Sequence, residues 1–204
     1  TRRKTALRAT LAKRDIDAAL FTSYHNICYY SGFLYCQFGR RYGLVIDHEQ
    51  ATTISAGIDG GQPWRRSHGD AITYTDWRRD NYFFALQGLT KGIKRLGIEF
   101  DHVSLELRGL LADALPGVEF VDIAADAMSQ RTIKSAEEHA LIREGARICD
   151  IGGAAVADAV APGIAEHEVA IASTNAHSGV PGVSASRLIV ITDMPITLWM
   201  WPSW

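Results

Sequence analysis

The chain has 204 residues, of which 47% are hydrophobic and 22% charged, a composition typical of a globular protein with a core of ordinary size. Its 21 basic side chains are balanced by 23 acidic ones, giving a formal net charge of -2, and this balance argues against nucleic acid or an anionic membrane as partner. No stretch has the apolar length of a bilayer-spanning helix or of a signal peptide, so a cytoplasmic protein is expected.

The first part of the chain alternates predicted helices and strands. Leu7 and Leu11 mark one face of a helix, and the apolar run at 18–21 predicts a buried strand after it. The apolar runs 43–46 and 52–58 flank a four-residue polar turn and predict a hairpin. Further strands are expected within 70–77, 95–100 and 118–124, and helices within 81–96 and 104–117. This alternation predicts an α/β fold, a mixed sheet covered by helices, over residues 1–130.

The pattern changes after residue 130. Ser135 and Glu138 stand three residues apart and predict a capping box, followed by apolar residues at helical spacing up to a Pro-Gly stop at 162–163. One long helix over 135–160 and a second helix from Ala165 are therefore expected. This helical hairpin would open a second domain, residues 131–204, with a hinge at 131–134. From about residue 177 the tail has no organising pattern.

Reactive side chains are scattered. Cys28, Cys36 and Cys149 are odd in number and irregularly spaced, which argues against a disulfide framework and favours buried or half-buried thiols. The seven histidines show no metal-binding spacing, so no metal site is predicted. Two Trp-Arg-Arg loops, 64–66 and 77–79, are interpreted as solvated loops in which arginine stacks on indole or pairs with aspartate.

The segment 24–40, YHNICYYSGFLYCQFGR, crowds aromatic and reactive side chains together. Gly39 frees the backbone to turn sharply, Phe38 offers an apolar wall, and the forked guanidinium of Arg40 can bind a carboxylate through two hydrogen bonds. Arg41, the next residue of an extended segment, is expected to point the opposite way, into solvent. Two interpretations stay open: a site for the carboxylate end of a small substrate, or a tyrosine-rich strand edge packed into the core.

Four stretches together resemble the creatinases, the creatine amidinohydrolases. They are the segment FTSYHNICYYSGFLYCQFGR and the stretches IDGGQPWRR, YTDWRRDNYF and IKSAEEHALIREGARICDIGGAAV, and the resemblance runs over about residues 8–175. It implies a ribonuclease H-like N-terminal domain with a mixed sheet flanked by helices. It also implies the start of a C-terminal pita-bread domain, of the superfamily that includes prolidase and methionine aminopeptidase.

The resemblance also implies an activity. Creatinases are homodimers with active sites at the subunit interface, and they hydrolyse creatine to sarcosine and urea without metal or other cofactor. Phe38 and Arg40 would reach into the partner's site, Phe38 as a wall and Arg40 as the partner of the substrate carboxylate, with the nearby tyrosines packed around their loop. The family's catalytic histidine and guanidinium-binding glutamates lie in the C-terminal domain beyond the resembling residues, so no catalytic residue is expected within this chain. A non-catalytic dimerisation or binding module and a prolidase-like metallopeptidase are the alternatives.

Overall fold

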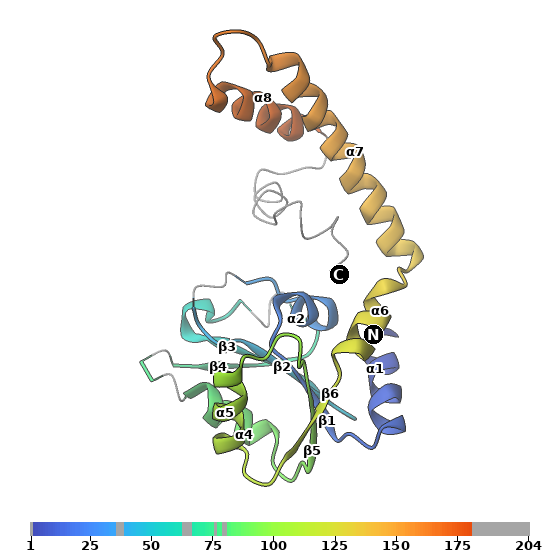
Figure 1. Ribbon diagram of the computed structural model, residues 1–204, viewed down its shortest axis with the longest axis vertical. Helices are drawn as coiled ribbons and strands as arrows, with labels where there is room; N and C mark the ends of the chain where they lie inside the picture. The colour runs from blue at the N-terminus through green and yellow to red at the C-terminus, as the bar shows by residue number, and fades with distance from the viewer. Residues whose placement is uncertain (1, 36–38, 63–66, 76, 79–80, 181–204) are drawn as a thin grey trace. The chain divides into compact units, whose positions relative to one another are not determined.

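The computed structural model describes residues 2–35, 39–62, 67–75, 77–78 and 81–180. The chain divides after Ile133 into two units, which are described separately here (Figure 1). None of the described helices is long and apolar enough to cross a membrane.

The first unit is built on a six-stranded sheet with the order β4-β3-β2-β1-β5-β6 (Figure 1). Strand β2 is antiparallel to both of its neighbours, and every other neighbouring pair is parallel. The start of β2 therefore lies at the edge of the sheet where the other five strands end. The strands are β1 (Ala18–Phe21), β2 (Gly43–Asp47), β3 (Ala51–Ala56), β4 (Asp70–Tyr74), β5 (Arg95–Ile98) and β6 (Glu119–Asp122).

Helices cover both faces of this sheet. Phe21 and its partner Leu44 in β2 share one face, where the Phe21 ring stacks on Tyr30 of α2 at 4.7 Å between centroids. Gly43, the residue before Leu44, faces the other way, and a Cβ atom added to it would lie 2.7 Å from the Tyr82 hydroxyl of α4. The helices of the unit are α1 (Arg2–Lys13), α2 (Tyr24–Ser31), α4 (Asn81–Leu89), α5 (Leu105–Ala114) and α6 (Ala124–Thr132), with a short 3-10 helix η1 (Gly57–Asp59) after β3. This arrangement confirms the predicted α/β class and the β2–β3 hairpin.

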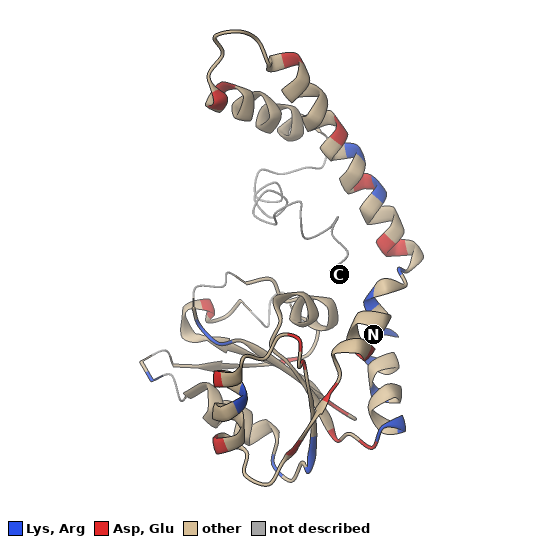
Figure 2. Ribbon diagram, viewed as in Figure 1, with Lys and Arg blue, Asp and Glu red and all other residues tan. Residues whose placement is uncertain are grey.

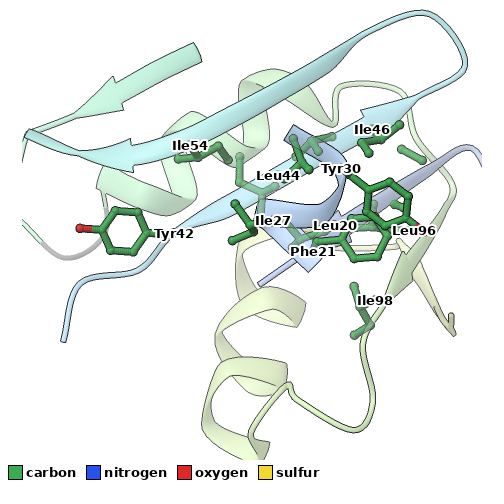
Figure 3. Packing of buried hydrophobic residues seen from close by; sticks show 14 of the residues in the cluster. Leu20, Phe21, Ile27, Tyr30, Tyr42, Leu44, Ile46, Ile54, Leu96 and Ile98 are labelled. Atoms are coloured by element: carbon green, nitrogen blue, oxygen red, sulfur yellow. The ribbon is translucent and has the colours of Figure 1, made fainter. Parts of the chain in front are cut away.

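The core lies between the sheet and its helices. Figure 3 shows aliphatic side chains of β1, β2 and β5 around the rings of Phe21 and Tyr30, with Ile54 of β3 farther along the cluster and Tyr42 at its end. Most of the labelled side chains are fully excluded from solvent, and burial of this kind contributes about 25 cal/mol per Å² of apolar surface. The hydroxyl of Tyr42 is turned away from the aliphatic groups, toward the sheet edge at which β2 begins (Figure 3).

Helix α2 corrects one expectation about the aromatic segment. Tyr24–Ser31 is neither a strand edge nor a loop, because Ser23 accepts a hydrogen bond from the Asn26 amide as N-cap and Gly32 ends the helix with a φ of 77°. Aromatic residues favour strands on average, and for this reason a strand edge was one of the two interpretations of the segment. The capping residues and the burial of Ile27 and Tyr30 decide the local structure instead. Helix α6 was likewise not expected.

The second unit is a helical hairpin of α7 (Ala136–Ala159) and α8 (Glu166–Ser178). The predicted capping box is confirmed, since Ser135 Oγ accepts from the Glu138 amide and the Glu138 carboxylate accepts from the Ser135 amide. Acidic side chains occupy the first turn of α7, and charges of both signs alternate along the exposed part of this helix (Figure 2). Gly152 of α7 is buried directly beneath the imidazole of His177, where a Cβ atom would overlap the ring.

Candidate functional site

The loop between α2 and β2 carries the residues singled out from the sequence. Gly39 has a φ of 71°, in the left-handed region that glycine adopts without strain. Arg40, next in the chain, is exposed at the sheet edge where β2 begins. Phe38, the other predicted substrate-binding residue, lies outside the described residues. The structure therefore shows an accessible Arg40 beside the turn, and the predicted pairing of Phe38 with Arg40 in one pocket stays a prediction.

The backbone directly after Arg40 is held by tyrosine hydroxyls. Tyr74 Oη, at the end of β4, donates to the carbonyl oxygen of Arg41 at 2.9 Å. Tyr82 Oη of α4 donates to the carbonyl oxygen of Tyr42 at 3.4 Å. The hydroxyl of Tyr42 donates in turn to Oδ2 of Asp59 in η1 at 2.5 Å. The elements β4, α4 and η1 thus contact Arg41 and Tyr42, the two residues before β2, which we call the strand entry.

The rings of these tyrosines pack in two groups, one with Tyr35 and Tyr42 and the other with Tyr74 and Tyr82. Tyr35 stacks on Tyr42 with 3.9 Å between ring centroids, and Tyr82 meets Tyr74 edge to face at 6.0 Å. Burial raises the pKa of Tyr35, Tyr42 and Tyr82 far above the usual range for a phenol, with the hydrogen bond to Asp59 a second cause at Tyr42. The hydroxyls therefore remain protonated donors throughout the physiological pH range.

Arg41 contradicts the expectation that it points into solvent. Its guanidinium lies 5.7 Å from the centroid of the Phe83 ring and 3.8 Å from Oε2 of Glu106, and the side chain is only 29% exposed. The local turn places Arg41 against α4 and α5 while Arg40 faces the solvent. The alternation of an ideal strand does not hold here, because β2 begins only at Gly43.

A buried carboxylate that sequence reasoning missed stands at the same edge. Glu99 follows β5, is 1% exposed, and accepts hydrogen bonds from the amides of Thr22 (2.6 Å) and Ser23 (2.9 Å). It also accepts from Ser23 Oγ at 2.5 Å and from Asn26 Nδ2 at 2.7 Å. A glutamate inside an otherwise apolar strand segment was the available signal, because such a side chain is rarely buried without partners. Its role in the structure is to join the end of β5 to the start of α2.

Burial and exposure determine the state of three other reactive side chains, those of His25, Cys28 and Cys149. Burial lowers the pKa of His25, with the charges of Arg131 and His102 as further causes, so this imidazole is neutral at pH 7. Burial raises the pKa of the half-buried Cys28 thiol, which is therefore not a thiolate. Cys149 is exposed, contrary to the expectation of a buried or half-buried thiol.

No three His, Cys, Asp or Glu side chains among the described residues lie close enough to hold a metal ion. Of the two Trp-Arg-Arg loops, positions 64–66 and Arg79 lie outside the described residues. Trp77 is described and is 87% exposed.

Comparison with known proteins identifies the family of the first unit. The profile of the Creatinase/Prolidase N-terminal domain family matches residues 3–133, which is the first unit almost in full. The chain belongs to this family.

Relatives extend the likeness into the second unit. A creatinase from Bacillus sp. (strain B-0618) is 52% identical over 182 residues, which cover 86% of this chain and 44% of that protein. The putative dipeptidase YkvY of Bacillus subtilis (strain 168) is 29% identical, over 86% of this chain and 50% of that protein. The chain thus spans about half the length of these curated relatives.

Solved structures share the fold. The prolidase from Pyrococcus horikoshii OT3 superposes with a TM-score of 0.71 and 23% identity, over 87% of this chain and 48% of that one. At this identity the likeness shows the fold alone. The family match and the shared fold agree: the first unit is a creatinase/prolidase N-terminal domain, as the sequence predicted.

Proposed function

We propose that this chain is the N-terminal half of an enzyme that hydrolyses creatine to sarcosine and urea. In this proposal Arg40 binds the substrate carboxylate and Phe38 lines the same pocket. The observation that carries the proposal is the exposed Arg40 at a glycine turn with a tyrosine-held backbone behind it. The 52% identity to the Bacillus creatinase supports creatine as the substrate.

The chemistry suits a guanidinium at this position. Creatine carries a carboxylate at one end and a guanidinium at the other, so an enzyme must hold the carboxylate while water attacks the guanidinium carbon. A forked arginine binds a carboxylate through two parallel hydrogen bonds, which fixes both distance and orientation. The general base and the carboxylates that hold the substrate guanidinium belong to the C-terminal domain in this proposal. The enzyme acts in the cytoplasm as a homodimer, each loop serving the partner's site, without a metal or other cofactor.

The test uses a completed enzyme, defined as residues 1–178 of this chain followed by the part of the Bacillus creatinase beyond the aligned region. Arg40→Ala should weaken creatine binding by about 2–5 kcal/mol, because it leaves the substrate carboxylate unpaired in a partly dry pocket. Arg40→Lys should recover only part of that loss, since an ammonium cannot make two parallel bonds. Creatine affinity by calorimetry and KM for urea release are the measurements.

The control is fold stability. Arg40 is exposed, so Arg40→Ala should change the free energy of unfolding by no more than about 0.5 kcal/mol, as ordinary surface substitutions do. The thermal midpoint should therefore shift only slightly. An Arg40→Ala protein that binds creatine normally but melts much lower would contradict the proposal. Arg40 would then be a structural residue of a tyrosine-rich edge.

Two other functions stay as alternatives. The similarity to a putative dipeptidase favours a metal-dependent peptidase of the prolidase type, which would need the metal ligands of its C-terminal domain. A non-catalytic dimerisation or binding module would bind a partner chain and show no turnover in any completed form. Creatine turnover by the completed enzyme, with a loss on Arg40→Ala, separates the proposed activity from both.

A further inference from the structure

The entry into β2 is anchored more heavily than a strand of this length requires. The antiparallel ladder of β2 already fixes residues from Gly43 onward through pairing with β1 and β3. The two residues before it, Arg41 and Tyr42, are bound in addition through their carbonyl oxygens by the hydroxyls of Tyr74 and Tyr82. These bonds come from β4 and from α4, so they tie the strand entry to two separate elements.

We propose that Tyr74, Tyr82 and the Tyr42–Asp59 pair are positioning residues for Arg40. This inference rests on the proposed function. Together they form a tyrosine clamp, defined by these four residues, that fixes the backbone from which the Arg40 side chain extends. A binding group is effective only when its support holds it near the productive geometry, and an error of about 1 Å can cost two orders of magnitude in rate.

The clamp is rigid on physical grounds. Tyr74 is 8% and Tyr82 1% exposed, so water does not compete freely for their hydroxyls. The raised pKa of Tyr42 and Tyr82 keeps both phenols protonated, and each continues to donate. Gly43 permits the close approach, because a side chain there would collide with the Tyr82 hydroxyl. Arg41 adds a further contact through its packing on Phe83 and Glu106.

Removal of one hydroxyl tests the clamp in the completed enzyme. Tyr74→Phe keeps the ring and removes the hydroxyl that donates to the Arg41 carbonyl. We expect KM for creatine to rise about three- to tenfold, the range of one hydrogen bond, with kcat changed by less than about twofold. Tyr82→Phe, whose bond is longer at 3.4 Å, should show a smaller rise. The matched control is Tyr30→Phe, which loses a partly buried hydroxyl bond to Gln130, away from the strand entry, and should leave KM unchanged.

A double-mutant cycle distinguishes positioning from general stability. If Tyr74 acts through Arg40, Tyr74→Phe should raise the dissociation constant of creatine in the parent and have no further effect in an Arg40→Ala background. Equal effects in the two backgrounds, or no effect in either, would overturn the clamp. Should Tyr74→Phe fail to fold, the same cycle with Tyr82→Phe decides. A silent Arg40→Ala would instead refute the proposed function, so the two failures are distinguishable.

Discussion

At the scale of single residues, neighbouring side chains of one loop have opposite surroundings. Arg40 faces solvent at a glycine turn, while Arg41 is held against an aromatic ring and a carboxylate of the first unit. The sequence Phe-Gly-Arg-Arg indicated a binding arginine, and it did not indicate which neighbour would pack inward. That choice depends on where the β2 ladder begins and on contacts from α4 and α5, which the local sequence does not contain.

His25 should make the first unit lose stability as the pH falls below neutrality. Its pKa is lowered in the folded protein by burial and by the charges of Arg131 and His102, and only Glu99 acts in the opposite direction. Above the ordinary histidine pKa of about 6.5 both states are neutral and the fold has its full stability. Below that value the unfolded chain takes up the proton first, so the free energy of unfolding falls until the pH reaches the folded pKa.

Thermal midpoints across pH 5 to 8 for the parent and for His25→Gln measure this contribution. The variant should lose less stability than the parent between about pH 6.5 and pH 5, because its side chain does not titrate. Parallel curves for the two proteins would show that another group is responsible.

At the scale of elements, the sequence predicted a helix or strand correctly where the contacts that fix it lie between residues close together in the chain. The helix of the second unit begins at the Ser135–Glu138 capping box as predicted, since both partners lie within one turn. Helix α2 escaped prediction because its aromatic residues favour strands, although Ser23 and Gly32 are local capping residues. A distant contact adds to these caps, since Glu99 binds the amides of Thr22 and Ser23 across more than 70 residues of sequence. In the candidate site, Arg40 was proposed from its motif, whereas Tyr74 and Tyr82 come from elements distant in sequence and were not.

The α7–α8 hairpin allows a paired test of glycine. Gly153→Ala should stabilise α7 by about 0.5–1 kcal/mol, because nothing lies within 4 Å of its added Cβ and alanine is the better helix former. Gly152→Ala should instead destabilise the hairpin by about 1–3 kcal/mol, since its Cβ would overlap His177. Chemical denaturation followed by far-UV circular dichroism gives both values.

A second substitution identifies the cause. In a His177→Ala background the Gly152→Ala change should lose most of its cost, because the overlapping ring is gone. A cost that persists would mean that the close contact at Gly152 lies with something other than the imidazole.

At the scale of the whole molecule, the two units differ in how far they stand alone. The first contains a complete sheet with a core on both faces, whereas the second is a hairpin with Leu141, Val160 and Ile171 well exposed. In proteins most helical stability comes from tertiary packing, and the described part of the second unit leaves these apolar side chains uncovered.

The metal requirement belongs to this scale, because it concerns the completed site. Creatine hydrolysis by a full-length form that carries this chain's own C-terminal domain should survive exhaustive dialysis against a chelator, since the proposed chemistry uses a general base and carboxylates rather than a metal-bound water. Urea release before and after dialysis is the measurement. Loss of activity that manganese or cobalt restores would favour the prolidase-type alternative.

Glu99 occupies the point of the first unit's sheet at which a ligand would ordinarily bind. Open α/β sheets ordinarily receive a ligand beyond the ends of neighbouring parallel strands whose following helices lie on opposite faces. Here β1 and β5 are such neighbours, with α2 on one face and α5 against α4 near the other, and the carboxylate of Glu99 already occupies the amides at that point. An anion from solution could not bind there, because the amides of Thr22 and Ser23 already donate to Glu99. Under the proposed function, substrate therefore does not bind at this point of the sheet; loops of the first unit supply side chains to a pocket whose other walls come from another domain or another subunit.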